Sequence, residues 1–143
     1  MKKVALIGSM RYYYKMAEIE RQLILNGYLP LTPTPVFGYD NKGVFNKQNE
    51  QSTIMDDQLK EKLNKLHLEK ITLADIILVC NFDDCIEESM FSEFCYAYHL
   101  TTFGMEKKLC FLQDNTENLT KEYLGSFPVY TYTGDLKSEL GIK

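Results

Sequence analysis

The chain alternates short apolar runs with amphipathic segments, and this order predicts strands separated by helices. The apolar runs cover residues 3–7, 28–31, 76–80, 108–112 and 129–132, and the run at 76–80 is continuous, as in a parallel strand covered on both faces. Helical spacing predicts helices after the first run as far as Gly27, from Ile54 to about Leu73, and from the turn at 81–85 to about Leu100. Shorter helices are predicted within 114–126 and at 135–140.

This order of elements predicts the fold class, because parallel strands need crossover connections. We expect an α/β fold with an open, mostly parallel sheet of four to five strands flanked by helices, Rossmann-like or flavodoxin-like. A chain of 143 residues is the size of one domain, so residues 1–143 are expected to form a single domain. The Pro-rich start of segment 33–53 predicts a flexible loop or lid. Ligands of such sheets bind at the carboxyl ends of the strands.

Composition and charge exclude several classes of function. Sixteen Lys and Arg against twenty Asp and Glu give a net charge of −4, which argues against binding a nucleic-acid polymer. The longest apolar runs are far shorter than the roughly 20 residues of a membrane span, and Met-Lys-Lys leads directly into the first strand, so we expect a cytoplasmic protein that does not bind membranes. Four scattered cysteines and two histidines favour reduced thiols, with neither a metal nor another cofactor.

The turn after the first strand is a candidate binding site. Gly8, Ser9, Met10 and Arg11 open the first helix, where free backbone N–H groups and the positive end of the helix dipole favour an anion or a polar ligand. A purely structural turn is the alternative, with Gly8 required by the backbone geometry and Ser9 as the N-cap. The Arg11 guanidinium suits a carboxylate or a phosphate, and equally a surface salt bridge.

The segment 83–93 concentrates carboxylates around the start of the third long helix. Asp84 with Glu87 predicts a capping arrangement, and acids near the positive end of a helix need no further explanation. Glu93 differs, because it shares a helix face with Ala97 and Leu100 and should therefore point toward the sheet. Inward carboxylates are usually paired or catalytic.

These segments together resemble the nucleoside 2-deoxyribosyltransferase superfamily, which includes the deoxynucleoside 5′-monophosphate N-glycosidases. The resemblance spans roughly residues 3–112 and is carried by the Gly-Ser-Met-Arg turn at 8–11, the segment 73–79 and the segment 92–98. In that family a glutamate in a Glu-x-Gly-x-Ala helix is the nucleophile on the anomeric carbon, and Glu93 followed by Ala97 matches it, with Cys95 in place of the glycine. The resemblance implies N-glycosidic cleavage or 2-deoxyribosyl transfer on a deoxyribonucleoside or its 5′-monophosphate through a glycosyl-Glu93 intermediate.

The resemblance assigns further roles in catalysis. Tyr12 or Tyr13 would orient Glu93 by a hydrogen bond or stack on the base. His67 stands eight residues before Asp75, where the family usually carries an aspartate that protonates or orients the base. A histidine there suits general acid catalysis, but its spacing from Leu63 and Ile71 fits a buried structural histidine equally well, and both interpretations stay open.

Different residues make opposite predictions about whether the substrate carries a 5′-phosphate. Glu87 stands six residues before Glu93, where the monophosphate glycosidases have a phosphate-binding serine and the transferases a carboxylate. Glu87 therefore favours a free nucleoside, whereas Ser9 and Arg11 favour a phosphate. Further candidate substrate contacts are Ser89 and Ser92 on the helix, and Asn81 after the strand at 76–80, which could equally close the turn.

Two further expectations concern partners and activity. Family members complete each pocket from a neighbouring subunit, so a homodimer or a larger homo-oligomer is implied, and the helix with Phe91, Phe94 and Tyr98, followed by Phe103, would supply aromatic surface. The departures at His67, Glu87 and Cys95 leave an alternative function, a catalytically inactive domain of the same fold that binds a nucleoside or nucleotide as a sensor. A protein-interaction module without any ligand is a weaker alternative.

Overall fold

Five strands form one parallel sheet in the order β2-β1-β3-β4-β5. The strands are β1 (Lys3–Ile7), β2 (Leu29–Leu31), β3 (Ile76–Val79), β4 (Lys108–Phe111) and β5 (Val129–Thr131). The computed structural model describes residues 1–33, 57–82, 86–112 and 129–131. The predicted α/β class with an open parallel sheet is confirmed. The predicted lid after residue 33, the first turn of the helix predicted from Ile54, and the short helices predicted at 114–126 and 135–140 lie outside the described residues.

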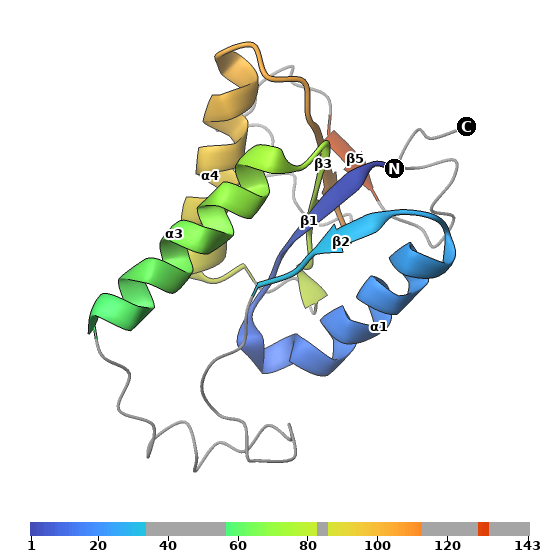
Figure 1. Ribbon diagram of the computed structural model, residues 1–143, viewed down its shortest axis with the longest axis horizontal. Coiled ribbons are helices and arrows are strands. Elements are labelled where there is room, and N and C mark those ends of the chain that lie inside the picture. The colour runs from blue at the N-terminus through green and yellow to red at the C-terminus, as the bar shows by residue number, and fades with distance from the viewer. Residues whose placement is uncertain (34–56, 83–85, 113–128, 132–143) are drawn as a thin grey trace.

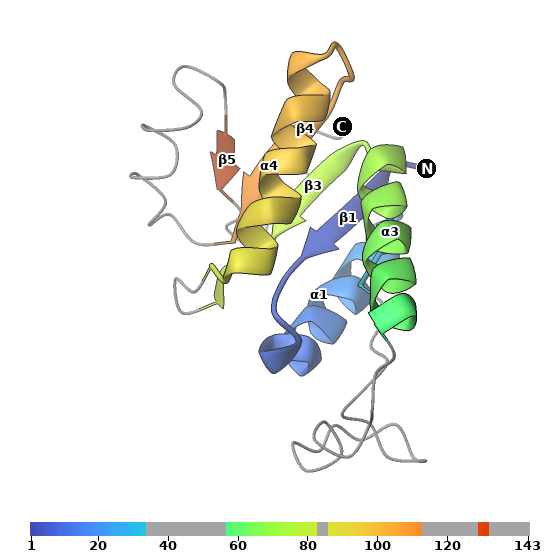
Figure 2. The ribbon, with the colours of Figure 1, turned by 90° about the vertical axis from the view of Figure 1, so that its left-hand side faces the viewer.

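Helices cover both faces of the sheet, in three layers. The short 3-10 helix η1 (Met10–Tyr12) leads into α1 (Tyr13–Leu25), and the other helices are α3 (Asp57–Leu73) and α4 (Glu88–Thr102). Helix α1 lies on one face, while α3 and α4 lie side by side on the other (Figures 1 and 2). The chain thus changes faces when it reverses direction along the sheet, as right-handed crossovers require.

The alternation of side chains along each strand divides the core into two halves. Val4, Leu6 and Leu78 pack toward α1, together with Met16 and Leu23 of that helix. The intervening strand residues pack toward α3 and α4, and include Ala5, Ile7, Ile77 and Val79. Because β1 and β3 are buried on both faces, a continuous apolar sequence is what each requires. This accounts for the uninterrupted apolar run at 76–80.

The ends of the helices follow the predicted signals in one case and contradict them in another. Helix α1 ends before Gly27, whose φ of +86° gives the left-handed conformation that favours glycine after a helix. The predicted capping arrangement of Asp84 with Glu87 is wrong. Helix α4 has Glu87 itself as its N-cap residue, and the Glu87 side chain makes no cap hydrogen bond because it is bonded elsewhere.

Asp75 joins the starts of the two central strands. Its Oδ2 accepts a hydrogen bond from the Lys3 backbone N–H at 2.9 Å, and its own N–H donates to the Lys3 carbonyl. These two bonds join the start of β3 to the start of β1. Asp75 therefore aligns the two central strands at the edge opposite the candidate site.

Strand β2 forms one edge of the sheet and carries Pro30 at its centre. Pro30 lies opposite Val4 of β1, and the preceding Leu29 N–H donates to the Lys2 carbonyl at 2.9 Å. Because successive backbone groups of a strand point to opposite sides, the Pro30 nitrogen points away from β1. Proline is tolerated in strands at such edge positions.

The topology fixes where a ligand site is expected. From β1 the chain passes through α1 to β2, and from β2 it passes through α3 to β3 on the other side of β1. The ends of β1 and β3 lie next to each other, with Ile7 opposite Val79. Ligands of open α/β sheets bind at this point of reversal, outside the carboxyl ends of the two strands.

The aromatic residues of α4 contribute less surface than the sequence predicts. Phe94 is buried and packs against Phe111 of β4, with ring centroids 5.2 Å apart. Phe103, just after the helix, is 85% exposed. The expectation that Phe94 supplies aromatic surface for a partner is therefore wrong, because this ring completes the core between α4 and the sheet. Within the described segments, no helix combines the length and apolar character needed to cross a membrane.

Two cysteines of the core allow the packing to be tested. Cys80 and Cys110 are buried, free thiols in the α1 half of the core, and burial raises the pKa of the Cys80 thiol far above its ordinary value. We expect a maleimide to leave both unmodified in the native protein at mildly alkaline pH and to label all four cysteines of the chain after denaturation. Peptide mass spectrometry measures the label at each site. Rapid native labelling of Cys80 would contradict the described packing.

The raised pKa of Cys80 also sets the sign of a pH effect. The thiol ionises at lower pH in the unfolded chain than in the folded protein, so its contribution to stability is present below the unfolded pKa, which is about 8.5 for a free thiol. It is lost as the pH rises further. Denaturant unfolding of the wild type and of Cys80→Ala at rising alkaline pH should show the steeper loss of stability in the wild type.

Candidate functional site

Ser9 joins the turn after β1 to the start of α4. It is buried, its backbone is extended, and its Oγ accepts a hydrogen bond from the Arg11 N–H at 3.2 Å, which confirms the predicted N-cap role. The same hydroxyl donates to Glu87 Oε1 at 2.8 Å. A hydroxyl can accept and donate at once, so both functions are satisfied by one side chain. Two segments 78 residues apart in the sequence therefore meet at this end of the sheet.

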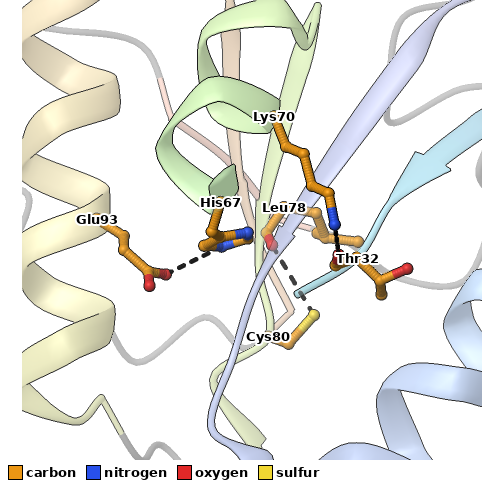
Figure 3. Close-up of polar contacts among 6 residues, drawn as sticks. All are labelled: Thr32, His67, Lys70, Leu78, Cys80 and Glu93. Carbon is orange, nitrogen blue, oxygen red and sulfur yellow. Dashed lines mark hydrogen bonds and ion pairs between the residues drawn. The ribbon is translucent and has the colours of Figure 1, made fainter. Parts of the chain in front are cut away.

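Glu93 and His67 face each other between α3 and α4, as Figure 3 shows. His67 Nε2 lies 3.2 Å from Glu93 Oε2, and the two side chains are 7% and 22% exposed. Glu93 is in the second turn of α4, and the neighbours on its face, Ala97 and Leu100, pack into the core, which explains why the carboxylate turns inward. Two residues that the sequence proposes as catalytic, from different helices, are thus in direct contact.

The environment of His67 is unusual for a buried histidine. Within the described part of the chain, neither ring nitrogen makes a hydrogen bond, because the 3.2 Å approach to Glu93 has the distance of an ion pair but not the direction of a hydrogen bond. A buried polar group without a hydrogen bond costs roughly 1–3 kcal/mol. Such a cost is typical of functional sites, where a small rotation or a ligand completes the bond.

An aromatic and cationic cluster lies beside the strand ends. The Tyr12 ring packs against Phe82 with centroids 5.4 Å apart, and the Lys15 ammonium lies 5.3 Å from the centre of the Tyr12 ring and 5.4 Å from that of Phe82. The Arg11 guanidinium lies 5.6 Å from the Tyr12 ring centre. Sequence reasoning missed Phe82 and Lys15. An aromatic residue in the first turn after the buried strand at 76–80 was the available signal for Phe82.

Of the other predicted contact residues, some are buried near the ends of the strands and others are exposed. Asn81 is buried directly beyond β3, and Met10 packs against the α1 half of the core. Tyr13 makes an edge-on ring contact with Tyr14. Ser89 and Ser92 are exposed on α4, on the side of the helix away from Met90 and Phe94. The structure therefore brings together Ser9 with Glu87 and His67 with Glu93, but it does not bury Ser89 or Ser92 in the same site.

Gly8 allows the first turn to lie close to the core. A Cβ built on Gly8 would be 2.3 Å from Met16 Sδ and 3.3 Å from Cys80 Cβ. The first distance is far below van der Waals contact. Gly8 is not among the described glycines with a positive φ, so the predicted backbone requirement is wrong and the requirement for glycine here is steric. The backbone of this turn lies directly over α1 and the end of β3.

The chemistry available at this end of the sheet is that of carboxylates, a histidine and cations. Glu87 and Glu93 supply the carboxylates, while Arg11 and Lys15 supply exposed positive charge. In the segments that the structure describes, no three His, Cys, Asp or Glu side chains come together as a metal site would require. Burial raises the pKa of the Cys95 thiol, which disfavours a thiolate nucleophile next to Glu93.

Comparisons with known proteins do not assign the chain to a family. A scan against protein-family models, a search of curated proteins and a search of solved structures find no match to this chain.

Proposed function

We propose that this protein cleaves the N-glycosidic bond of a 2′-deoxyribonucleoside, or transfers its 2-deoxyribosyl group, with Glu93 as the nucleophile. The contact of Glu93 with His67 carries the proposal, because a mostly buried carboxylate beside an imidazole is typical of catalytic sites. The resemblance of segments 8–11, 73–79 and 92–98 to the nucleoside 2-deoxyribosyltransferase superfamily supports the same role. The parallel sheet order supports a ligand site at this edge.

The proposed reaction proceeds in two displacements. A Glu93 carboxylate oxygen attacks C1′, the C1′–O bond forms, and the C1′–N bond breaks with its electron pair leaving on the base, which takes up a proton. Water or a second base then attacks C1′ and releases a proton, which balances the proton taken up by the departing base. The ester bond to Glu93 breaks, restoring the carboxylate. Hydrolysis and transfer differ only in this second nucleophile. The transition state of each step has oxocarbenium character, which the nearby negative carboxylate stabilises.

The bond between Ser9 and Glu87 favours a free nucleoside over a 5′-monophosphate. The Ser9 hydroxyl donates to the Glu87 carboxylate beside the N-terminus of α4, so a negative charge already lies next to the helix end that could attract a phosphate. A second anion there would be repelled. A neutral 5′-hydroxyl, in contrast, can donate to that carboxylate.

Replacing Glu87 by serine tests this preference. The Glu87→Ser variant removes the negative charge and leaves a hydroxyl at the start of α4, so we expect kcat/KM for deoxynucleoside 5′-monophosphates to rise by roughly 10-fold relative to free nucleosides. The measurement is the ratio of the two kcat/KM values in the wild type and the variant. Glu87→Gln, which removes the charge alone, should give a smaller change in the same direction. An unchanged ratio in both variants would contradict the assignment.

The experiment for the function as a whole detects the covalent intermediate. Wild-type protein is incubated with a panel of deoxynucleosides and deoxynucleotides, and released base is followed by chromatography while intact-mass spectrometry follows the protein. We expect base release together with an added 2-deoxyribosyl mass on the peptide that contains Glu93. Binding without base release would instead support the alternative of an inactive sensor domain, and no binding at all would contradict both functions.

Partners and location are part of the same proposal. A homodimer or larger homo-oligomer is proposed from the family resemblance. The exposed Phe103 side chain supplies apolar surface for contact between subunits. A cytoplasmic location is proposed from the cysteines, since Cys80 and Cys110 are core thiols that form no disulfide. Light scattering at micromolar concentration measures the assembly state, and a strict monomer would count against the oligomer.

A further inference from the structure

We propose that His67 is a positioning residue that holds the Glu93 carboxylate for attack, rather than the acid that protonates the departing base. This inference rests on the proposed function of Glu93 as the nucleophile. The sequence leaves His67 as either a general acid or a buried structural histidine, and the surroundings of the imidazole restrict what it can reach.

Both ring nitrogens of His67 are enclosed by protein. Each has essentially no solvent-accessible surface, and the whole side chain is only 7% exposed. In Figure 3 the imidazole lies between the Glu93 carboxylate and the strands of the sheet. A proton donor must come within hydrogen-bonding distance of the atom that it protonates. The enclosed position of His67 leaves Glu93, and not a substrate base, as the group it reaches.

The arrangement suits a hydrogen bond from His67 to Glu93. With the proton on Nε2, a neutral imidazole can donate to Glu93 Oε2 once the ring turns to align the N–H, since the two atoms are already 3.2 Å apart. The bond would fix one carboxylate oxygen and leave Oε1 for attack on C1′. Glu93 has three rotatable side-chain bonds, so fixing its orientation lowers the entropy lost on reaching the transition state.

The helices that carry the pair are themselves held together nearby. The hydroxyls of Thr72 on α3 and Tyr96 on α4 are hydrogen-bonded at 2.8 Å. Ile71 of α3 and Phe94 of α4 are both buried in the core that these helices share with the sheet. A pairing between side chains on two helices needs such a fixed spacing, since a shift of about 1 Å between reacting groups can cost roughly 100-fold in rate.

Two substitutions of similar volume distinguish the loss of a hydrogen-bond donor at residue 67 from the loss of packing there. His67→Gln retains an N–H at nearly the position of Nε2, whereas His67→Met fills the same space without a donor. We expect His67→Met to lower kcat by about 10- to 100-fold with little change in KM, and His67→Gln to retain kcat within a few-fold. Equal losses of kcat in both variants, or no loss in either, would overturn the positioning role. Thermal unfolding of both variants checks that they fold alike.

Imidazole NMR of the full-length protein gives a readout that needs no substrate. The chain has two histidines, so long-range 1H–15N spectra contain one exposed reference, His99, beside His67. We expect His67 to be the tautomer protonated at Nε2, and its Nε2 resonance to move in Glu93→Ala while the His99 resonances stay in place. A tautomer protonated at Nδ1, or His67 resonances identical in wild type and variant, would overturn the inference. A wild type that shows the expected His67 signal but releases no base would overturn the proposed function alone.

Discussion

Replacing Glu93 by glutamine is expected to lower base release from deoxynucleosides by about 10³-fold or more, while substrate binding is retained. The amide has the size of the carboxylate but lacks its negative charge, so it can neither form the ester with C1′ nor stabilise oxocarbenium character. The Glu93 side chain is 22% exposed, and the amide oxygen of glutamine can still face His67 Nε2, so the change should leave the fold intact. Chromatographic detection of free base measures kcat, and calorimetry measures binding.

The matched control for Glu93 lies on the same helix. Glu88 is exposed in the first turn of α4, so Glu88→Gln removes one carboxylate from the same segment without touching the pair with His67. Its activity should equal that of the wild type. Comparable turnover in Glu93→Gln and in the wild type would sink the nucleophile assignment.

Adding a single methyl group at Gly8 is expected to destabilise the protein by roughly 1–3 kcal/mol. The new Cβ would lie 2.3 Å from Met16 Sδ and 3.3 Å from Cys80 Cβ. Met16 and Cys80 are both buried, so the Met16 side chain has little space into which to move. Urea unfolding of wild type and Gly8→Ala measures the change in the free energy of unfolding.

A double-mutant cycle identifies the cause of this destabilisation. Met16→Ala removes the atom that the new methyl group would strike, at its own cost of about 2–5 kcal/mol. In the Met16→Ala background, the penalty of Gly8→Ala should shrink to near zero, because only the looser approach to Cys80 remains. An undiminished penalty would contradict the clash with Met16 as the cause of the destabilisation.

The sheet was predictable from the sequence because its signals are local. The five predicted apolar runs match β1, β2, β3, β4 and β5 within one residue at each end, and Gly27 ends the first helix as predicted. The start of α4 was predicted three residues too early, because the acidic sequence Asp84 to Glu87 resembles a capping box. The long-range bond from Ser9 to Glu87 uses the carboxylate that the local pattern assigned to the cap.

The candidate site was predictable where helix periodicity fixes a direction. The helical spacing of Glu93 from Ala97 and Leu100 predicts that its side chain points inward, and the spacing of His67 from Ile71 predicts that the imidazole is buried. Neither pattern predicts that the two side chains contact each other. That contact depends on the packing of α3 against α4. The pairing of Tyr12 with Phe82 likewise depends on the adjacency of β1 and β3, which sequence order does not specify.

Pro30 constrains how copies of this protein can associate. Pro30, the middle residue of β2, has no N–H on the side of β2 that faces away from β1. A strand from another molecule that paired with this side would therefore lack one backbone hydrogen bond. Continuation of the sheet across this edge from one molecule into the next is therefore disfavoured, and so is templated growth of fibrils from it. Any homo-oligomer should consequently be built through helices and side chains rather than through shared β-structure at β2.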